Sequence, residues 1–171
     1  RTRRQRQMCI RDSIKRGDVW ELATPKNIAS FDYQDNDEEG LFFLTNFEAP
    51  NYRLVKILYT GEVVEIIPET DLALKSISIL DDFIITNSIN TDMNSMVEFY
   101  SKDGVLLDFK IPDDIEGTLS SFSMYKDKLR FSVSNFINPT RYIDLDLNTL
   151  DYTIVWQDKV SNFNPANYEK T

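Results

Sequence analysis

The sequence predicts an all-β protein made of about three four-stranded antiparallel blades of a β-propeller. Runs rich in β-branched and aromatic residues, each short enough to be a strand, recur along the 171 residues. Runs that close on Thr-Asn or Ser-Asn begin at residues 41, 82 and 130, so they repeat at spacings of 41 and 48 residues. Units of roughly 40–50 residues with four short strands and turn signals are typical of propeller blades.

Each unit is expected to open with two strands. The second strand ends at the Thr-Asn or Ser-Asn step, where a short polar side chain can bond the turning backbone. The predicted first strands are residues 27–33, 74–80 and 119–125, and the predicted second strands are residues 41–46, 82–87 and 130–135.

The third and fourth strands of each unit are expected to form a hairpin. Tight connections at Thr60-Gly61, Asp103-Gly104 and Asn148-Thr149 separate them, and such dipeptides close hairpins. The predicted third strands are 52–59, 95–102 and 141–147, and the fourth strands are 62–68, 105–112 and 151–157. The blades therefore span about 14–69, 70–115 and 116–160. A β-sandwich is the alternative, because it also alternates short strands with turns.

The first thirteen residues, "RTRRQRQMCIRDS", differ in composition from the rest. They contain five of the 19 basic residues and one of the 28 acidic residues, which leaves 14 basic and 27 acidic residues in the body. We interpret residues 1–13 as non-native or disordered sequence outside the fold, and residues 14–171 as the partial propeller. A nucleic-acid-binding arm is the alternative interpretation of the basic segment.

The acidic body makes nucleic acid an unexpected partner, because phosphate-tracking surfaces need clustered Lys and Arg. The single cysteine, Cys9, lies in the atypical segment, so the body cannot form a disulfide. No apolar run approaches the roughly 20 residues of a membrane-spanning helix. We therefore expect a soluble, cytoplasmic protein without a membrane partner. A periplasmic location is the alternative, because the true N-terminus is expected to be missing.

The sequence assigns no catalytic, cofactor-binding or metal-ligating residue, and no cofactor is expected. It contains no histidine, so a Ser-His-Asp triad or a His-bearing zinc site cannot be assembled from it. The five glycines are isolated, which excludes a phosphate-cradling loop.

Two acidic segments share some features with calcium-binding loops. In "DNDEEG" (35–40), Asp35, Asp37 and Glu39 have the spacing of the first ligands, but the twelfth place is Asn46, where a bidentate Glu is needed. A solvated hairpin turn is the expected structure. "PDDIEG" (112–117) is expected to be an acidic connection between blades.

Other candidate residues also have structural interpretations. Asp144 and Asp146 are expected on one solvated strand face, and Arg141 is expected to be an exposed residue at a strand start, although it could meet a substrate carboxylate. Aromatic residues in strands are expected in the core between blades rather than in a ligand cage; they include Phe42, Phe43, Phe83, Phe131 and Trp156.

Three segments resemble the propeller domain of prolyl oligopeptidase, a serine peptidase family that cuts short peptides after proline. They are "FDYQDNDEEGLFFLTNFEAPNYRLVKI" (31–57), "FSVSNFINPTRYIDLDL" (131–147) and "VSNFNPANYEKT" (160–171). The resemblance covers roughly 18–171, and the oligopeptidase B group shares parts of the first and third segments. Two residues depart from the family pattern. Asn135 stands where the family often has Ser or Thr, and Asn164 stands where Asp is usual.

The resemblance implies that the chain holds the last three of seven blades. It implies that a catalytic α/β-hydrolase domain with the Ser, Asp and His would follow Thr171, and that this fragment by itself would be inactive. The propeller would gate the access of short proline-containing peptides, which are the implied substrates. The alternative is a stand-alone propeller that binds proteins or peptides without catalysis.

Overall fold

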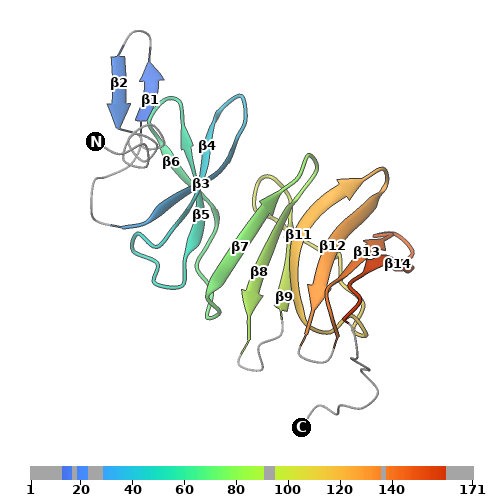
Figure 1. The fold of residues 1–171 in the computed structure, drawn as a ribbon. Coiled ribbons are helices and arrows are strands. Elements are labelled where there is room, and N and C mark those ends of the chain that lie inside the picture. The colour runs from blue at the N-terminus through green and yellow to red at the C-terminus, as the bar shows by residue number, and fades with distance from the viewer. Residues whose placement is uncertain (1–12, 17–18, 23–28, 91–94, 136–137, 161–171) are drawn as a thin grey trace. The chain divides into compact units, whose positions relative to one another are not determined.

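The computed structural model describes residues 13–16, 19–22, 29–90, 95–135 and 138–160. The regular secondary structure in these ranges consists of β-strands alone, which are numbered β1 to β14 (Figure 1). The chain divides into two compact units, Arg1–Ala73 and Leu74–Thr171, and each is described by itself. The prediction for residues 1–13 lies outside the described residues except at Ser13, the first residue of β1.

The first unit contains a hairpin and a four-stranded sheet. Strands β1 (Ser13–Arg16) and β2 (Val19–Leu22) pair with each other and form a separate sheet. The four-stranded sheet, called here the first sheet, is an antiparallel meander in sequence order. It consists of β3 (Phe31–Asn36), β4 (Gly40–Thr45), β5 (Arg53–Leu58) and β6 (Val63–Ile67).

Buried apolar residues explain why β4 and β5 are the central strands of the first sheet. Phe43 pairs with Val55 across the two strands, and both are buried together with Ile57. The ring of Phe31 meets the ring of Phe43 edge to face at 6.3 Å. Branched and aromatic cross-strand pairs of this kind stabilise antiparallel sheets.

The second unit contains two further meanders of four consecutive strands, which are called the second and third sheets. The second sheet consists of β7 (Leu74–Ile79), β8 (Ile84–Ile89), β9 (Ser95–Tyr100) and β10 (Leu106–Leu107). The third sheet consists of β11 (Thr118–Tyr125), β12 (Lys128–Ser134), β13 (Arg141–Leu145) and β14 (Tyr152–Gln157).

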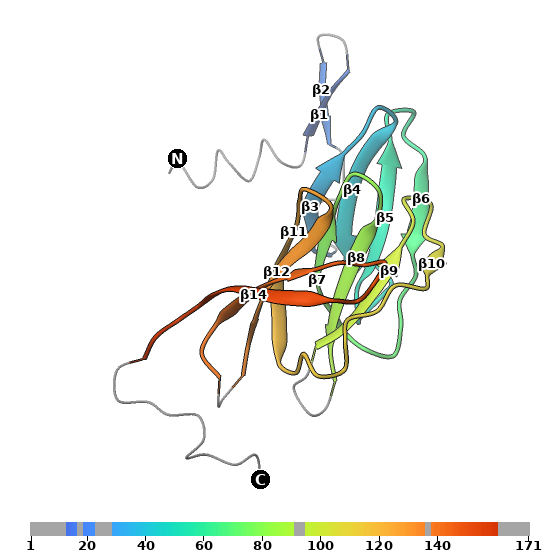
Figure 2. The ribbon, with the colours of Figure 1, turned by 90° about the vertical axis from the view of Figure 1, so that its right-hand side faces the viewer.

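The second and third sheets share one apolar core. The second sheet and the turn before β8 contribute Phe83, Ile85 and Phe99 to this core. The third sheet contributes more of its residues, among them Phe131 and Ile143. Strand β11 comes close to β7 and β8 (Figures 1 and 2). The first strands of the two sheets therefore lie near each other, and both sheets bury a face in the same cluster.

The repeat read from the sequence is confirmed. Each predicted blade contains one four-stranded sheet, and each sheet is built from consecutive strands. An immunoglobulin-type sandwich distributes strands between its sheets by Greek-key connections, so the simple meanders favour blades. Two strands differ clearly from expectation: β8 has the predicted length but is shifted, so that it continues two residues beyond Asn87, and β10 has two residues where eight were predicted.

Candidate functional site

The Thr-Asn step of the first sheet anchors a corner of the backbone. The hydroxyl of Thr45 donates a hydrogen bond to the carbonyl oxygen of Ser30 at 2.7 Å, and the side-chain oxygen of Asn46 accepts one from the Ser30 N–H at 2.7 Å. The two side chains therefore fix the end of β4 beside the start of β3, as the sequence predicts in outline.

The corresponding step in the second sheet has another role, so its prediction as a strand end was wrong. Asn87 lies inside β8 and is buried. Its Nδ2 donates to the carbonyl oxygen of Leu119 in β11 at 2.7 Å. This hydrogen bond connects the second sheet to the third. Strand β8 does not end at Asn87, because its pairing with β9 continues through Ser88 and Ile89.

The acidic segment 35–40 is a hairpin turn, as predicted. Asp37 Oδ1 accepts hydrogen bonds from the N–H groups of Glu39 and Gly40. Lys56, 7% exposed, places its Nζ 2.8 Å from Asp37 Oδ2 and 2.6 Å from Glu39 Oε2. The carboxylates therefore hold a lysine of the protein itself.

These contacts shift the pKa values of both partners. Burial favours neutral Lys56, but its bonds to Asp37 and Glu39 outweigh burial and raise its pKa. Burial likewise favours neutral Asp37, yet bonds from Lys56 and two backbone N–H groups lower its pKa. Within the described residues, the structure contains no group of three or more His, Cys, Asp or Glu placed to hold a metal ion.

Asp144 differs from its prediction as a residue on a solvated face. It is 6% exposed, and its two oxygens accept hydrogen bonds from Arg130 Nε and Nη2 at 2.6 and 2.7 Å. The guanidinium carbon lies 3.9 Å from the centre of the Tyr125 ring. The bonds from Arg130 lower the pKa of Asp144 despite its burial. Sequence spacing missed the pair because its members lie on neighbouring strands, β12 and β13.

Asp146 does not share the strand with Asp144, because β13 ends at Leu145. Its Oδ1 accepts bonds from the N–H groups of Asn148 and Thr149, which closes the predicted turn and lowers its pKa. Arg141 begins β13 and is half-buried rather than exposed.

The prediction of a core position fails for one aromatic residue. Trp156 is 49% exposed and meets the ring of Tyr142 edge to face at 5.6 Å. It lies on the edge strand β14, whose apolar sequence resembles that of a core strand. The other four aromatic candidates are buried: Phe42, Phe43, Phe83 and Phe131.

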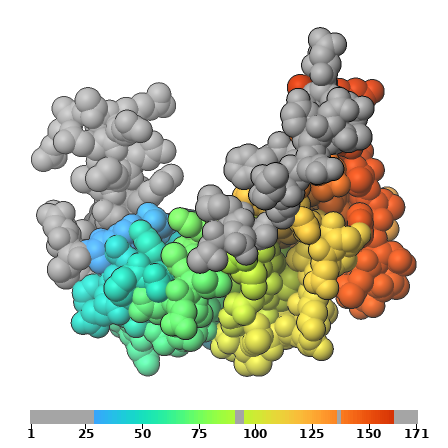
Figure 3. Space-filling model, turned by 90° about the horizontal axis from the view of Figure 1, so that it is seen from below, coloured from blue at the N-terminus to red at the C-terminus, as the bar shows by residue number. Residues whose placement is uncertain are grey.

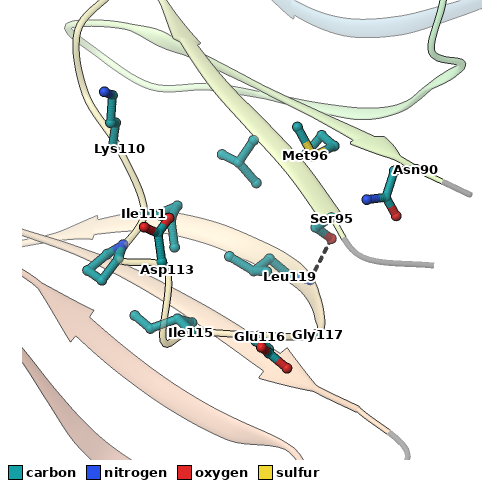
Figure 4. Close-up of a pocket in the computed structure, with 12 residues that line it drawn as sticks. Asn90, Ser95, Met96, Lys110, Ile111, Asp113, Ile115, Glu116, Gly117 and Leu119 are labelled. Carbon is teal, nitrogen blue, oxygen red and sulfur yellow. Dashed lines mark hydrogen bonds between the residues drawn. The ribbon is translucent and has the colours of Figure 1, made fainter. Parts of the chain in front are cut away.

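A cavity of about 420 Å³ borders the connection from β10 to β11 (Figure 4). The segment around Lys110, Ile111 and Asp113 forms one wall, and β9 residues including Met96 form the opposite wall. In the space-filling view the connection, coloured yellow, lies at the molecular surface (Figure 3). The sequence does not predict this cavity. Its one related signal is Pro112 in the predicted strand 105–112, since Pro cannot donate to a strand ladder.

The described side chains hold no Ser-His-Asp constellation, because the whole sequence lacks histidine. The polar clusters are ion pairs and turn-forming contacts within and between the sheets. Within the described residues, no helix has the length and apolarity needed to cross a bilayer.

Two curated proteins resemble the chain in sequence. A prolyl endopeptidase of Dictyostelium discoideum is 28% identical over 155 residues, which cover 82% of this chain and 20% of the relative. The dual-function macrocyclase-peptidase POPB of Galerina marginata is 23% identical over 167 residues, covering 94% of this chain and 23% of the relative. The chain thus spans about a fifth of the length of these proteins.

Solved structures show the same fold. Prolyl oligopeptidase B of Galerina marginata, bound to a 35mer hydrolysis and macrocyclization substrate, matches with a TM-score of 0.75 at 22% identity, over 91% of this chain and 23% of that one. Oligopeptidase B of Leishmania major matches with a TM-score of 0.66 at 18% identity, over 91% of this chain and 24% of that one. These matches support the blade interpretation over the sandwich.

A family model decides the relationship. The model described as the prolyl oligopeptidase N-terminal β-propeller domain matches residues 2–158. The repeated meanders, the sequence relatives and the similar structures agree with this match. The chain belongs to the prolyl oligopeptidase family and corresponds to part of its N-terminal β-propeller domain.

Proposed function

We propose that this chain is part of a prolyl oligopeptidase-like serine endopeptidase whose propeller gates the access of short peptides to a catalytic α/β-hydrolase domain. The observation that carries the proposal is the family match over residues 2–158, combined with relatives of which the chain covers only 20% and 23%. Short proline-containing peptides are the proposed substrates of the whole protein.

The residues of the chain are consistent with a gating role for the propeller and with a catalytic role for another part of the protein. A triad needs a histidine as its general base, and the sequence has none, so bond cleavage would be performed by residues outside it. The described sheets contribute buried aromatic clusters and paired charges, which suit a rigid wall. In this proposal the blades exclude large substrates by their shape.

The test is to express the complete reading frame that contains this sequence and to measure peptide cleavage. We expect a short fluorogenic peptide with proline before the scissile bond to be cleaved, and the same site within a long folded or unfolded polypeptide to be cleaved far more slowly. Equal cleavage of both substrates would contradict gating. No cleavage after proline would contradict the proposed enzyme class.

A stand-alone propeller that binds peptides without catalysis is the second candidate. The cavity beside β9 favours it, because a concave site of about 420 Å³ falls within the roughly 300–1,000 Å³ typical of ligand sites. A reading frame that encodes only further blades would support this candidate. The cytoplasmic location, with a periplasmic location as the alternative, stays a prediction.

A further inference from the structure

The fourth strand of the second sheet is much shorter than its counterparts. Strand β10 has two residues, whereas β6 has five and β14 has six. It pairs only with Phe99 and Tyr100 of β9. In the described part of the chain, no strand therefore lies beside the outer edge of β9 from Ser95 to Glu98.

Core packing explains why the chain leaves this edge after Leu107. The ring of Phe109 meets the rings of Phe83 and Phe99 at 5.9 and 5.8 Å, so it is held against the shared core. Ile111 packs against the same cluster, and the following Pro112 has no N–H to offer a ladder. The cavity occupies the space between the departing segment and β9.

The backbone of Val97 faces the open edge. Peptide groups alternate in direction along an antiparallel strand. The Ser101 N–H donates to the Val105 carbonyl across the β9–β10 hairpin, and the Ser95 N–H donates to the Gly117 carbonyl. Val97 lies two residues after Ser95 and four residues before Ser101. The alternation therefore gives its N–H and C=O the same direction as those of the serines, away from β8. Among the described residues, no backbone group pairs with either of them.

The walls of the cavity combine apolar side chains with acidic groups. Val97, Ile111, Ile115 and Leu119 are buried or half-buried, and all line the cavity. Alternation places Met96 and Glu98 on the face of β9 opposite to the Val97 side chain, where both are exposed, although Met96 also borders the cavity at the strand edge. The Oε2 atom of Glu98 accepts a hydrogen bond from the Tyr100 hydroxyl at 3.0 Å. Asp113 adds an exposed carboxylate, while Lys110 already lies 3.9 Å from Asp108. A ligand that pairs with this edge therefore meets apolar groups on one face and negative charge on the other.

We propose that this cavity binds an extended cationic peptide, which adds a short strand to the free edge of β9. Main-chain bonds to Val97 hold the peptide, in the manner of β-strand addition. The apolar residue opposite Val97 enters the cavity beside Ile111 and Leu119. Its two neighbours point to the other face, where a basic side chain meets Glu98. This site goes beyond the gating role and does not depend on it.

The test is photo-crosslinking of the full chain with the probe Ac-Thr-Lys-photoleucine-Lys-Thr-NH2, followed by peptide mapping. A diazirine at the central position reports where the apolar residue sits, even when binding is weak. We expect labels within residues 95–97 and 111–119. A matched probe N-methylated at the central residue cannot donate its main-chain hydrogen bond there, and we expect at least fivefold less label at these positions.

Charge reversal gives a second readout. Glu98→Lys should reduce labelling by the lysine probe by roughly two- to fivefold, the range for a cross-strand ion pair. A probe with Glu in place of both Lys should regain label on this variant. Glu62→Lys, an exposed position on the β5–β6 hairpin, is the matched control and should leave labelling unchanged.

Two results would overturn the proposal. Equal labelling by the N-methylated and unmethylated probes would show that main-chain pairing is absent, and this comparison needs no variant to fold. Labels spread along the chain, or concentrated away from β9 and the 110–119 connection, would show that the edge is not a site.

Discussion

Among the described residues of the second unit, Asp144 and Arg130 form the ion pair with the shortest contacts. Two short hydrogen bonds join them, and the side chain of Asp144 is 9% exposed, compared with 30% for Arg130. Paired geometry of this kind holds a guanidinium in one orientation. The pair therefore fixes β12 against β13 on the face that is turned away from the shared core.

The pair makes stability dependent on pH in the acid range. The bonds from Arg130 place the pKa of folded Asp144 below its ordinary value of about 3.9. Its contribution is therefore complete above that value and is lost as pH falls through the lower, folded pKa. We expect Asp144→Asn to lower the melting temperature at pH 7 and to flatten the fall in stability below about pH 4. Asp151→Asn, at an exposed turn, is the control and should leave the melting temperature at pH 7 unchanged.

Gly117 occupies a backbone position that other residues adopt with strain. Its φ is +135°, and a Cβ there would lie 2.5 Å from the carbonyl oxygen of Ser134. We expect Gly117→Ala to destabilise the chain by at least the roughly 1–3 kcal/mol of a strained backbone position, measured by urea unfolding. Gly61→Ala, at an exposed turn with φ 97°, is the control. An equal loss in both variants would show that the contact with Ser134 is unimportant.

Single-residue environments were the hardest feature to predict. Alternation assigned Asp144 to a solvated face, but a partner 14 residues away on another strand made it a buried charge. The recurrence of aromatic residues at comparable strand positions of successive units predicts a core position for Trp156, yet its strand is the edge of its sheet. Both errors arise because burial depends on neighbouring strands, which a local pattern does not specify.

At the scale of elements, Asn87 is the side chain that joins β8 of the second sheet to β11 of the third. We expect Asn87→Ala to cost roughly 1–3 kcal/mol, because it leaves the buried carbonyl of Leu119 without this donor. Asn87→Asp should cost more, since a carboxylate oxygen would face that carbonyl. Hydrogen exchange should report faster opening of β11. Unchanged exchange in both variants would show that the bond does not hold the sheets together.

Strand positions were predictable because the pattern and the turn residues agreed. The hairpins at Gly61, Gly104 and Asn148 occur where they were expected, with positive φ at both glycines. Pro112 indicates only that the predicted strand 105–112 is too long; the packing of Phe109 against Phe99, which ends β10 after Leu107, is a tertiary contact that the sequence does not specify. The cavity follows from this tertiary contact, so it could not be found from the sequence.

At the scale of the whole molecule, the chain contains fewer blades than a closed propeller. Propeller blades bury their faces against neighbours around a ring. The third sheet exposes Tyr142, Ile154, Val155 and Trp156, a concentration of apolar side chains on β13 and β14. Exposed apolar patches of this kind promote association.

We therefore expect the isolated chain to bind a hydrophobic dye and to self-associate. Dye fluorescence and size-exclusion chromatography measure these two properties. A monomer that binds no dye and melts in one cooperative transition would contradict the expectation, because it would show that the exposed faces need no further blades.

The family could be predicted from the sequence because three motifs and the repeat pointed to the same fold, and the match over residues 2–158 confirms it. The activity of the whole protein could not be derived from the residues, since the chemistry proposed for it lies outside them. The proposed peptide site beside β9 could not be inferred from the sequence, because it depends on both the register of β10 and the cavity, which only the structure shows.

The complete reading frame around this sequence tests the central claim most directly. If the chain is three blades of a gating propeller, the sequence that precedes it should encode about four more blades. The sequence that follows should encode an α/β-hydrolase domain with a Gly-x-Ser-x-Gly nucleophile motif. A frame that ends after further blades, or continues into an unrelated domain, would contradict the claim.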